Sequence, residues 1–382
     1  MSRPVIVVGA GIFGAVVAER LASQCGLPVT VIDRRPHAGG NCWSETDAAS
    51  GIEVHKYGSH IFHTSDTRVW DYLNQFTQWN GYRHHVWSRH EGRVYPLPIG
   101  LATVNSFYGK DLNPAQLKDF LAGEAAREGI SEPRNLEEKA ISLIGRPLYE
   151  AFIRGYTRKQ WQKDPTELSA EIITRLPVRH DYNIRYFSDT FEGIPLQGYG
   201  AVFDRLLANP LISLRLNIDW RDLRESVSPE TLVIYSGPID QFYDYRLGRL
   251  EWRGLDFEWE TLPVRDYQGT SVINSADERE AFTRTHEFRH YHPERPYGDE
   301  TVICREYSRW AGQDDEPYYP VNTAANRELY SRYARLAARE ENVIFGGRLG
   351  SYRYLDMDKC IGQALECSQK IAGRLRGQAG GA

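Results

Sequence analysis

The first 33 residues contain the pattern that most restricts the fold of this chain. Residues 5–8 (VIVV) are an all-apolar run, which predicts a buried parallel strand. The turn G-A-G-I-F-G follows at residues 9–14, and apolar residues at helical spacing then continue to Gly26. A second apolar run ends at Asp33, about 20 residues after the third glycine. Strand, glycine turn, helix, strand and acid are the parts of a dinucleotide-binding βαβ unit, so we expect an α/β protein with a Rossmann-type domain.

Each glycine of this unit has its own physical role in holding a dinucleotide. Gly9 allows the tight turn, Gly11 lets backbone N–H groups approach the pyrophosphate, and Gly14 lets the helix pack on the strand. The helix N-terminus offers unpaired N–H donors to the same anion. Asp33 is expected to accept hydrogen bonds from the ribose hydroxyls. Because NAD and FAD both bind to this unit, the choice of cofactor depends on the rest of the chain.

Two further glycine-rich segments favour FAD. The segment R-R-P-H-A-G-G-N, residues 34–41, contains a glycine pair that could close over an extended flavin cofactor, although a simple loop turn is the alternative. From residue 343 an apolar run, the turn G-G-R-L-G and a helical pattern to about Leu375 follow one another. With these segments the chain resembles the FAD-binding fold of the amine oxidase and glutathione reductase type, in which a C-terminal strand and helix return to the flavin.

The periodicity of the middle of the chain changes twice. Residues 78–168 have mostly helical spacing, with Asn113 and Asn135 in helix-capping positions. Residues 169–307 alternate instead, which indicates a largely antiparallel sheet, and the apolar run at 231–237 reads as a buried strand that returns to the first domain. We therefore predict a mixed α/β fold of three parts: a discontinuous FAD-binding domain at 1–77, 198–245 and 311–382, an inserted helical bundle at 78–168, and an antiparallel sheet domain that binds substrate at 169–197 and 246–310.

Composition argues against several classes of function. Lys and Arg number 46 against 51 Asp and Glu, so the net charge is −5 and no overall basic field exists to hold nucleic acid. The most apolar stretch, residues 5–18, contains glycines and is shorter than the roughly 20 residues of a membrane-spanning helix. Five scattered cysteines without a C-x-x-C pair, and no signal peptide, predict a reduced, cytoplasmic protein.

The stretch H-E-F-R-H at residues 286–290 matches the zinc-protease pattern H-E-x-x-H, which needs a helix to bring both histidines to one ion. Here larger side chains fall on alternate positions and β-branched threonines lie among them, which predicts a strand. The alternate positions are Phe282, Arg284, His286, Phe288, His290 and His292. Positions four apart on a strand are separated by roughly 13 Å, which two Zn–N bonds of about 2 Å cannot span. We therefore expect no metal site here.

Five blocks of residues carry a narrower resemblance. They occur in order over nearly the whole chain and are similar to the prokaryotic UDP-galactopyranose mutase family: GSHIFHT (58–64), RGYTRKQW (154–161), YSGPID (235–240), PYYPV (317–321) and GRLGSYRYLDMD (347–358). Two departures are small. Ser59 stands where the family often has proline, and His84-His85 stands where asparagine is common, which leaves open any polar contact of His84 with the substrate.

The resemblance implies a flavin-dependent isomerase. Such an enzyme interconverts UDP-galactopyranose and UDP-galactofuranose without net redox change and supplies galactofuranose for cell-surface glycans. It also implies FAD that is active when reduced, with flavin N5 attacking the anomeric carbon, UDP leaving, and a flavin–sugar iminium that allows ring contraction. A small-molecule nucleotide sugar is then the substrate, and a homodimer is the expected assembly.

The resemblance also implies roles for individual residues. Arginines suit a departing diphosphate, because their guanidinium groups bind phosphate oxygens in pairs. The catalytic residues implied are Arg175, Arg284 and His63. The substrate-binding residues implied are Phe152, Tyr156, Thr157, Trp161, Arg175, Tyr186, Asn274, Arg284, Tyr319, Tyr354 and His84. The cofactor-binding residues implied are Gly9, Gly11, Phe13, Gly14, Asp33, Arg34, Gly40, Asn41, His60, Ile61, His63, Gly347, Arg348, Tyr354, Asp356 and Met357.

Three other functions are open at this point. An FAD oxidoreductase of the amine oxidase fold shares the cofactor motif but has no need for arginines and tyrosines around a diphosphate. An NAD-dependent sugar epimerase needs Tyr-x-x-x-Lys, and no tyrosine in this chain has a lysine four residues later. A non-catalytic binding protein of the FAD fold is expected to expose a sizeable apolar patch. For any single arginine or tyrosine, a solvated or half-buried structural position is the commoner role.

Overall fold

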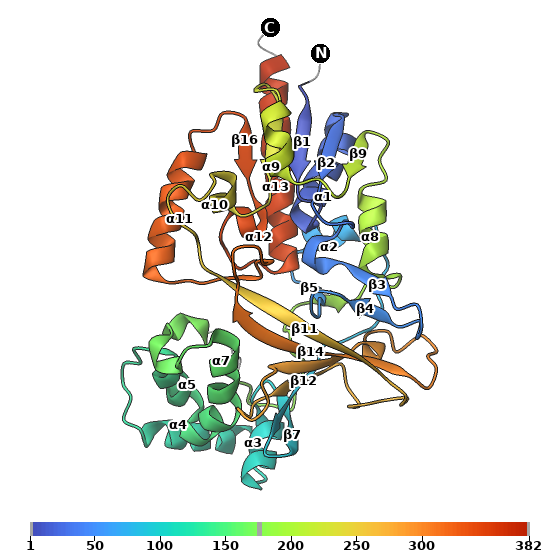
Figure 1. Ribbon diagram of the computed structural model, residues 1–382. Coiled ribbons are helices and arrows are strands. Elements are labelled where there is room, and N and C mark those ends of the chain that lie inside the picture. Colours follow the sequence, from blue (N-terminus) through green and yellow to red (C-terminus); the bar gives the residue numbers. More distant parts are fainter. Residues whose placement is uncertain (1–2, 174–177, 380–382) are drawn as a thin grey trace.

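A five-stranded parallel sheet forms one end of the molecule in the computed structural model, which describes residues 3–173 and 178–379 (Figure 1). The central strand β1 pairs with β10 on one side and β2 on the other. The predicted Rossmann-type sheet is confirmed, and the apolar run at 231–237 does return to it. The strands in spatial order are β16 (Val343–Phe345), β10 (Leu232–Tyr235), β1 (Val5–Val8), β2 (Val29–Ile32) and β9 (Ile212–Arg215).

The helices α1 (Ile12–Cys25) and α13 (Met357–Ala379) pack against each other beside this sheet. A Cβ atom on Gly14 would overlap the carbonyl oxygen of Gly9, so only glycine allows this close approach of helix and turn. α1 ends at Gly26, where φ is 64°, and α13 extends beyond its predicted end. The other helices of this part are α2 (Thr67–Leu73), α8 (Gly198–Leu206), α9 (Trp220–Leu223), α10 (Ile239–Phe242), α11 (Ala324–Ala337) and α12 (Gly347–Gly350), with 3₁₀ turns η1 (Gly40–Cys42) and η5 (Arg224–Ser226).

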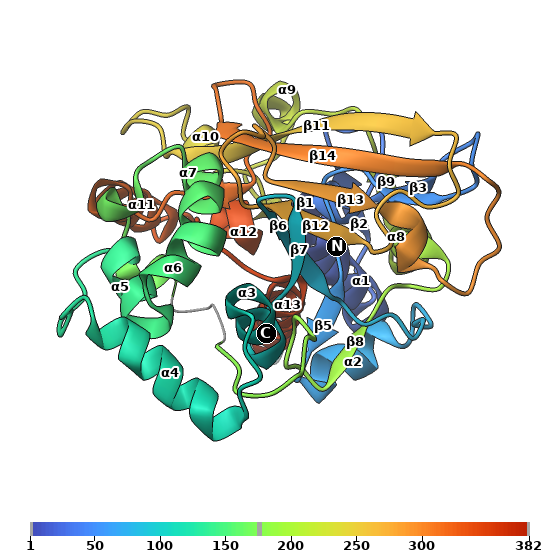
Figure 2. The same ribbon diagram turned by 90° about the horizontal axis from the view of Figure 1, so that it is seen from below.

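A seven-stranded sheet crosses the middle of the molecule (Figures 1 and 2). Its neighbouring strands are antiparallel, as predicted, except for the parallel pair β12 and β6. The strands in spatial order are β15 (Tyr319–Pro320), β11 (Trp252–Leu262), β14 (Thr301–Trp310), β13 (Arg284–Glu287), β12 (Val272–Ser275), β6 (Val86–His90) and β7 (Arg93–Leu97). Two short antiparallel pairs, β3 (Ser44–Thr46) with β4 (Glu53–His55) and β5 (Phe62–Thr64) with β8 (Phe191–Gly193), lie beside it.

The helical reading of residues 78–168 is wrong for β6 and β7. These strands form a hairpin whose connection, Glu91-Gly92, has φ values of 48° and 76°. Positive φ at both central residues is typical of a type I′ turn, whose twist matches that of the flanking strands. The hairpin extends the seven-stranded sheet and connects it to the helices that follow.

Those helices gather on one side of the seven-stranded sheet (Figures 1 and 2). The predicted caps are confirmed, because the Asn113 side chain accepts from Gln116 N and the Asn135 side chain from Glu138 N. The helices are α3 (Leu101–Tyr108), α4 (Pro114–Ala126), α5 (Leu136–Ile144), α6 (Arg146–Tyr149) and α7 (Gly155–Trp161), with a π-helical turn η2 (Glu150–Arg154) and 3₁₀ turns η3 (Pro165–Glu167) and η4 (Ala170–Ile172).

Two large apolar cores hold these parts. One lies between α1, α13 and the parallel sheet and reaches the inner face of the seven-stranded sheet at Val272 and Cys304. The second lies among the helices α3 to α7, around Leu117 and Tyr149. Within residues 3–173 and 178–379, no helix is both long enough and apolar enough to cross a membrane.

Candidate active site

A cleft of about 1210 Å³ opens at the carboxyl ends of β1, β2 and β10. Ligands of open parallel sheets bind at this edge. Most of the predicted cofactor-binding residues line the cleft, namely Gly9, Gly11, Phe13, Asp33, Arg34, Gly40, Asn41, His60, Gly347, Arg348 and Met357. Residues without a predicted role also line it, among them Arg35, Ile218, Trp220, Tyr235 and Glu316.

Around Gly11 and Gly40 the cleft is lined by backbone without side chains. A Cβ atom on Gly40 would lie 3.1 Å from Cα of Gly11, so two glycine backbones meet there. Among the described residues no side chain caps α1 at Gly11, so its first N–H groups are open to an anion. Asp33 is held in place because Ala10 N and Arg35 N each donate to one of its oxygens, at 2.8 and 2.9 Å. Each oxygen keeps a second lone pair for a ribose hydroxyl, so the residues fit a dinucleotide.

Two arginines and a glutamate close one side of the cleft. Glu316 Oε1 lies 2.7 Å from Arg34 NH2, and Glu316 Oε2 lies 2.7 Å from Arg35 NH2. Burial lowers the pKa of Arg35, but Glu316 more than offsets this and raises it. Arg35 NH1 is buried without a partner among the described residues, which leaves a donor for a bound group. The sequence analysis assigned Arg34 and missed Arg35, although both follow Asp33 directly.

Five predicted cofactor residues lie outside the cleft lining. Gly14 packs behind the glycine turn, and Ile61 is buried in the core. Burial raises the pKa of Tyr354, and Asp356, which is in hydrogen-bond contact with it, raises it further. The ring of Tyr354 lies 5.9 Å from that of Tyr319 on β15, and His63 lies on β5, which pairs with β8.

Arg284 is the centre of a second cluster, on β13. Its NH2 donates to Tyr156 Oη, and its Cζ lies 5.7 Å from the centre of that ring. On the other side its Nε is 3.5 Å from Glu306 Oε1. Burial lowers the pKa of Arg284, but Glu306 and the hydroxyls of Tyr156, Tyr319 and Tyr186 raise it well above its ordinary value. The structure therefore gathers three of the predicted substrate-binding residues, Tyr156, Tyr186 and Tyr319, around the permanent positive charge of Arg284.

Glu306 joins Arg284 to a buried chain of hydrogen bonds. His286 Nε2 donates to Glu306 Oε2 at 3.1 Å, and Ser59 Oγ lies 2.5 Å from His286 Nδ1. Ser59 also contacts the hydroxyl of Tyr291. Against the opposing effect of burial, Arg284 and His286 lower the pKa of Glu306 to about 2, so the carboxylate stays ionised. Ser59, a departure from the family's usual proline, thus orients His286 through a hydroxyl.

Arg348 connects the Arg284 cluster to the cofactor cleft. Its guanidinium lies 4.9 Å from the ring centre of Tyr354 and 5.8 Å from that of Tyr319, while its side chain also lines the cleft. The carbonyl oxygens of Tyr318 and Leu355 hold it, at 3.2 and 2.7 Å. The Arg348 side chain would therefore lie next to a group bound in the cleft and next to a group bound in the Arg284 cluster.

Other predicted substrate residues are placed at different distances from Arg284. Asn274 is its cross-strand partner on β12, and the buried Oδ1 of Asn274 has no partner among the described residues. Thr157 and Trp161 lie on α7 with Tyr156, and Trp161 packs against the helical core. Phe152 is 3% exposed and is surrounded by Tyr95, Phe107 and His90, so it is not part of the Arg284 cluster. Arg175 lies outside the described residues.

Three of the predicted site residues are histidines, and one of them, His60, lines the cleft. Burial, with help from Arg284, lowers the pKa of His84 to about 3, and its Nδ1 is 2.9 Å from Tyr82 Oη. Burial also lowers the pKa of His60 to about 4. His63 Nδ1 donates to Asp189 Oδ2 at 2.7 Å, and its ring stacks on Phe187 at 3.6 Å between centres. A neutral imidazole at His84 is thereby fixed, and Asp189 fixes the ring of His63.

Glu306 and Asp189 were missed by the sequence analysis. Glu306 occupies the same face of β14 as the buried Cys304 and Ser308, so an inward-facing charge in an alternating strand was the available signal. Asp189 lies shortly before β8, in a stretch whose sequence shows no motif or periodicity, so no signal pointed to it.

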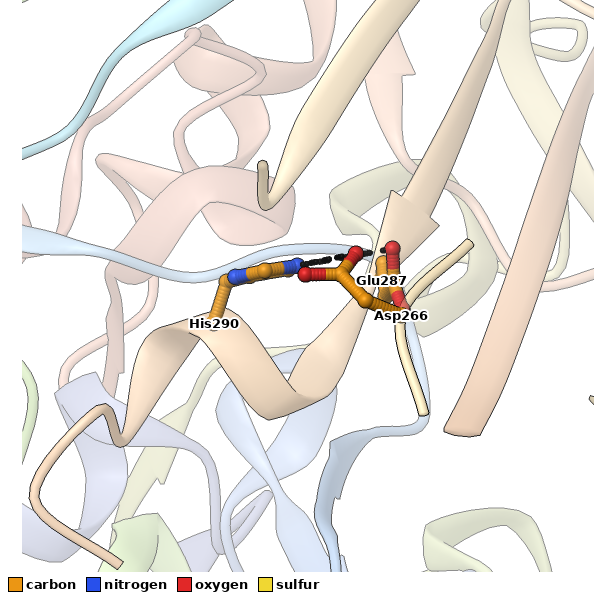
Figure 3. Close-up of side chains that lie close together, drawn as sticks. All are labelled: Asp266, Glu287 and His290. Atoms are coloured by element: carbon orange, nitrogen blue, oxygen red, sulfur yellow. Dashed lines mark hydrogen bonds and ion pairs between the residues drawn. The ribbon is translucent and has the colours of Figure 1, made fainter. Parts of the chain in front are cut away.

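The H-E-F-R-H stretch does not bring its two histidines to one ion. β13 ends at Glu287 and the 3₁₀ turn η6 (Phe288–Tyr291) follows, so the strand is shorter than predicted. Both ring nitrogens of His286 are already bonded in the buried chain. His290 points elsewhere, with Nε2 3.1 Å from Asp266 Oδ1 and 3.5 Å from Glu287 Oε2 (Figure 3).

Asp266, Glu287 and His290 place three metal-type ligand atoms within 4.8 Å of one another. Glu287 accepts from the backbone N–H groups of Tyr267 and Gln268, at 2.9 and 2.8 Å. Although burial lowers the pKa of His290, the two carboxylates raise it above its ordinary value. The Nε2 atom of His290 contacts both acids, and the three side chains thereby fasten the 266–268 loop to η6.

The fold and the cleft define a dinucleotide-binding α/β protein whose cofactor cleft opens toward an arginine–tyrosine cluster. A profile of an NAD(P)-binding Rossmann-like domain matches residues 7–76, and one of the UDP-galactopyranose mutase family matches residues 151–354. A Klebsiella pneumoniae protein described as "Probable UDP-galactopyranose mutase" is 40% identical over 377 residues, covering 99% of this chain and 97% of that protein. The dTDP-fucopyranose mutase of Escherichia coli is 38% identical over 369 residues, covering 96% and 97%.

Solved structures agree with this fold. Reduced UDP-galactopyranose mutase is similar with a TM-score of 0.73 at 18% identity, covering 97% of this chain and 96% of that chain. A putrescine oxidase is similar with a TM-score of 0.58 at 13% identity, covering 97% and 99%. The chain therefore belongs to the UDP-galactopyranose mutase family. FAD is the cofactor of this family, and the cleft residues fit it.

Proposed function

We propose that this protein is a flavin-dependent isomerase that interconverts UDP-galactopyranose and UDP-galactofuranose. The observation that carries the proposal is Arg284, which lies between Tyr156 and Glu306 and meets the cofactor cleft across Arg348. A permanently charged guanidinium beside an aromatic ring suits a nucleoside diphosphate, because the phosphates take the charge and the base can stack. Full-length similarity to two sugar-nucleotide mutases supports the same activity.

The residues of this chain then have separate tasks in the reaction. Reduced FAD, when bound, supplies a nucleophilic flavin nitrogen. Arg284 holds the diphosphate and stabilises the charge that develops as UDP departs. Tyr319 and Tyr354 donate hydroxyl groups toward the same phosphates, and the free Oδ1 of Asn274 accepts from the nucleotide. Arg175 is proposed as the second phosphate-binding arginine by resemblance alone.

The identity of the sugar and of the base is the more specific part of the proposed substrate. Two relatives, 40% and 38% identical to this chain, are named for a UDP-sugar and for a dTDP-sugar. UDP-galactose is the substrate implied by the ordered sequence blocks. A dTDP-fucopyranose mutase activity is the second candidate, because the Escherichia coli relative is nearly as similar.

Anaerobic turnover tests the activity and the substrate together. The FAD-loaded protein is incubated with UDP-galactofuranose or dTDP-fucofuranose, with and without dithionite, and the pyranose product is separated by chromatography. We expect conversion of UDP-galactofuranose only after reduction. Conversion of the dTDP-sugar alone would replace the substrate, and failure of both under reduction would refute the mutase activity.

We also propose a cytoplasmic location, from the scattered cysteines, and a homodimer, as the family resemblance implies. The division into a discontinuous FAD-binding domain, a helical domain and a sheet domain is proposed with the boundaries given above. Sedimentation of the FAD-loaded protein at micromolar concentration tests the dimer.

A further inference from the structure

The helix α7 carries a lysine whose ammonium group is surrounded by oxygen atoms of a single loop. Lys159 Nζ lies 2.8 to 3.2 Å from four backbone carbonyl oxygens and one hydroxyl. The acceptors are Ser275 O, Ser275 Oγ, Asp277 O, Glu280 O and Phe282 O. They span the connection 276–283, which joins β12 to β13.

This loop and helix lie in very close contact at a second point. A Cβ atom on Gly155, at the start of α7, would overlap the carbonyl oxygen of Ala276 and lie 3.1 Å from Glu278 Cγ. Only a glycine lets the helix backbone lie this near the loop. Gly155 and Lys159 are four residues apart and hence on one face of the helix, so both fasten the same surface to the 276–283 connection.

The fastened elements carry the residues that meet in the substrate cluster. Tyr156 lies on α7, one turn before Lys159, and its hydroxyl accepts from Arg284, the first residue of β13. Asn274 lies at the other end of the connection, on β12. The contact between α7 and the connection therefore sets the separation of Tyr156 from Arg284 and Asn274.

We propose that Lys159 is a positioning residue for the nucleotide-sugar site: its ammonium group holds the 276–283 connection against α7 and so keeps Tyr156 in place against Arg284. This inference rests on the proposed function. Lysine suits the task because it offers three donors on a compact charge, whereas the flat guanidinium of arginine fits a fork of acceptors and not a cage. Without the ammonium group the four carbonyl oxygens would lose a partly buried donor.

The neighbouring Arg158 provides a matched control. It lies on the same helix and reaches the same loop, with NH1 3.2 Å from Glu278 Oε1, but the side chains of this pair are 38% and 51% exposed. An exposed ion pair of this kind contributes little, whereas the carbonyl cage of Lys159 holds the backbone itself. Arg158→Met removes one cation from α7 without touching the cage.

The experiment compares wild type, Lys159→Met, Lys159→Arg and Arg158→Met as FAD-loaded proteins. UDP affinity is measured from the change in flavin absorbance, and amide hydrogen exchange is followed in residues 276–283. We expect Lys159→Met and Lys159→Arg to bind UDP about tenfold more weakly and to exchange faster in this loop, with FAD content unchanged. Arg158→Met should match wild type in both readouts.

Chemical rescue separates positioning from a loss of folding. Lys159→Ala leaves a cage of oxygen atoms into which ethylammonium can bind, so ethylammonium should restore UDP affinity and neutral ethanol should not. Faster loop exchange with wild-type UDP affinity in both Lys159→Met and Lys159→Arg would overturn the proposal, as would unaltered exchange in the two variants. If FAD-loaded wild type does not respond to UDP, the proposed function fails, and the exchange rates alone then decide whether Lys159 holds the loop.

Discussion

Replacing Glu306 by glutamine tests the buried electrostatics of the site. Glu306 is 3% exposed, and its carboxylate lies 3.5 Å from Arg284 Nε and 3.1 Å from His286 Nε2. Its pKa of about 2, against an ordinary 4.5, means that these partners favour the ionised form. At 1.36 kcal/mol for each pKa unit, this preference corresponds to about 3 kcal/mol of folding free energy at pH 7.

The sign of the pH dependence follows from the direction of the shift. A carboxylate whose folded pKa is depressed contributes stability that is fully present above about pH 4.5 and is lost as the pH falls toward 2. Glu306→Gln removes the charge at every pH, so it should cost about 3 kcal/mol at pH 7 and progressively less below pH 4.5. At about 2.1 cal/mol/K of unfolding entropy for each of 382 residues, 3 kcal/mol lowers the Tm by about 4 °C.

The assay is thermal unfolding of wild type and variant at several pH values between 7 and 3, at matched FAD content. Glu260→Gln is the matched control, because Glu260 on β11 pairs with Arg305 at 2.9 Å but its side chain is 43% exposed. The control should change the Tm by no more than about 1 °C. A Glu306→Gln protein that melts within 1 °C of wild type at pH 7, or whose deficit is the same at pH 7 and pH 3, would refute the argument.

Three further substitutions test separate parts of the account. Arg284→Ala removes the charge that holds the diphosphate, so UDP affinity measured from flavin absorbance should fall about 100-fold while FAD stays bound; retained affinity would contradict its role. Gly40→Val places a side chain against the backbone of Gly11, so the purified protein should contain little FAD by absorbance, and full occupancy would show that the glycine pair does not line the cofactor. Asp189→Asn removes the charge that orients His63, so in the reduced protein kcat should fall by a larger factor than KM changes. An unchanged kcat would contradict a role for Asp189 in orienting His63.

The sequence predicted those features that local patterns determine. The βαβ unit, its C-terminal return and the caps at Asn113 and Asn135 are short-range, because a strand, a turn or a cap depends on residues a few positions apart. The Glu91-Gly92 hairpin had a local signal too, a glycine turn between alternating residues. The helical spacing of the residues that follow it determined the prediction for residues 78–168 instead.

Other features could not be predicted, because they depend on pairing between distant segments. Glu306 meets Arg284 only through the register of β13 with β14. Lys159 is bound by backbone carbonyl oxygens, and every residue type supplies such an acceptor, so no motif identifies it. Phe152 packs in the helical core, and the contact with the nucleotide that the family resemblance implies for it stays a prediction.

Isomerisation with no net redox change is tested by comparing the number of flavin electrons consumed with the number of product molecules formed. Under strictly anaerobic conditions the FAD of the protein is reduced once, excess reductant is removed, and UDP-galactofuranose is added while flavin absorbance and pyranose product are both followed. We expect many product molecules for each flavin, with the flavin still reduced at the end. Reoxidation of one flavin for each product molecule, as in an oxidoreductase, would contradict it.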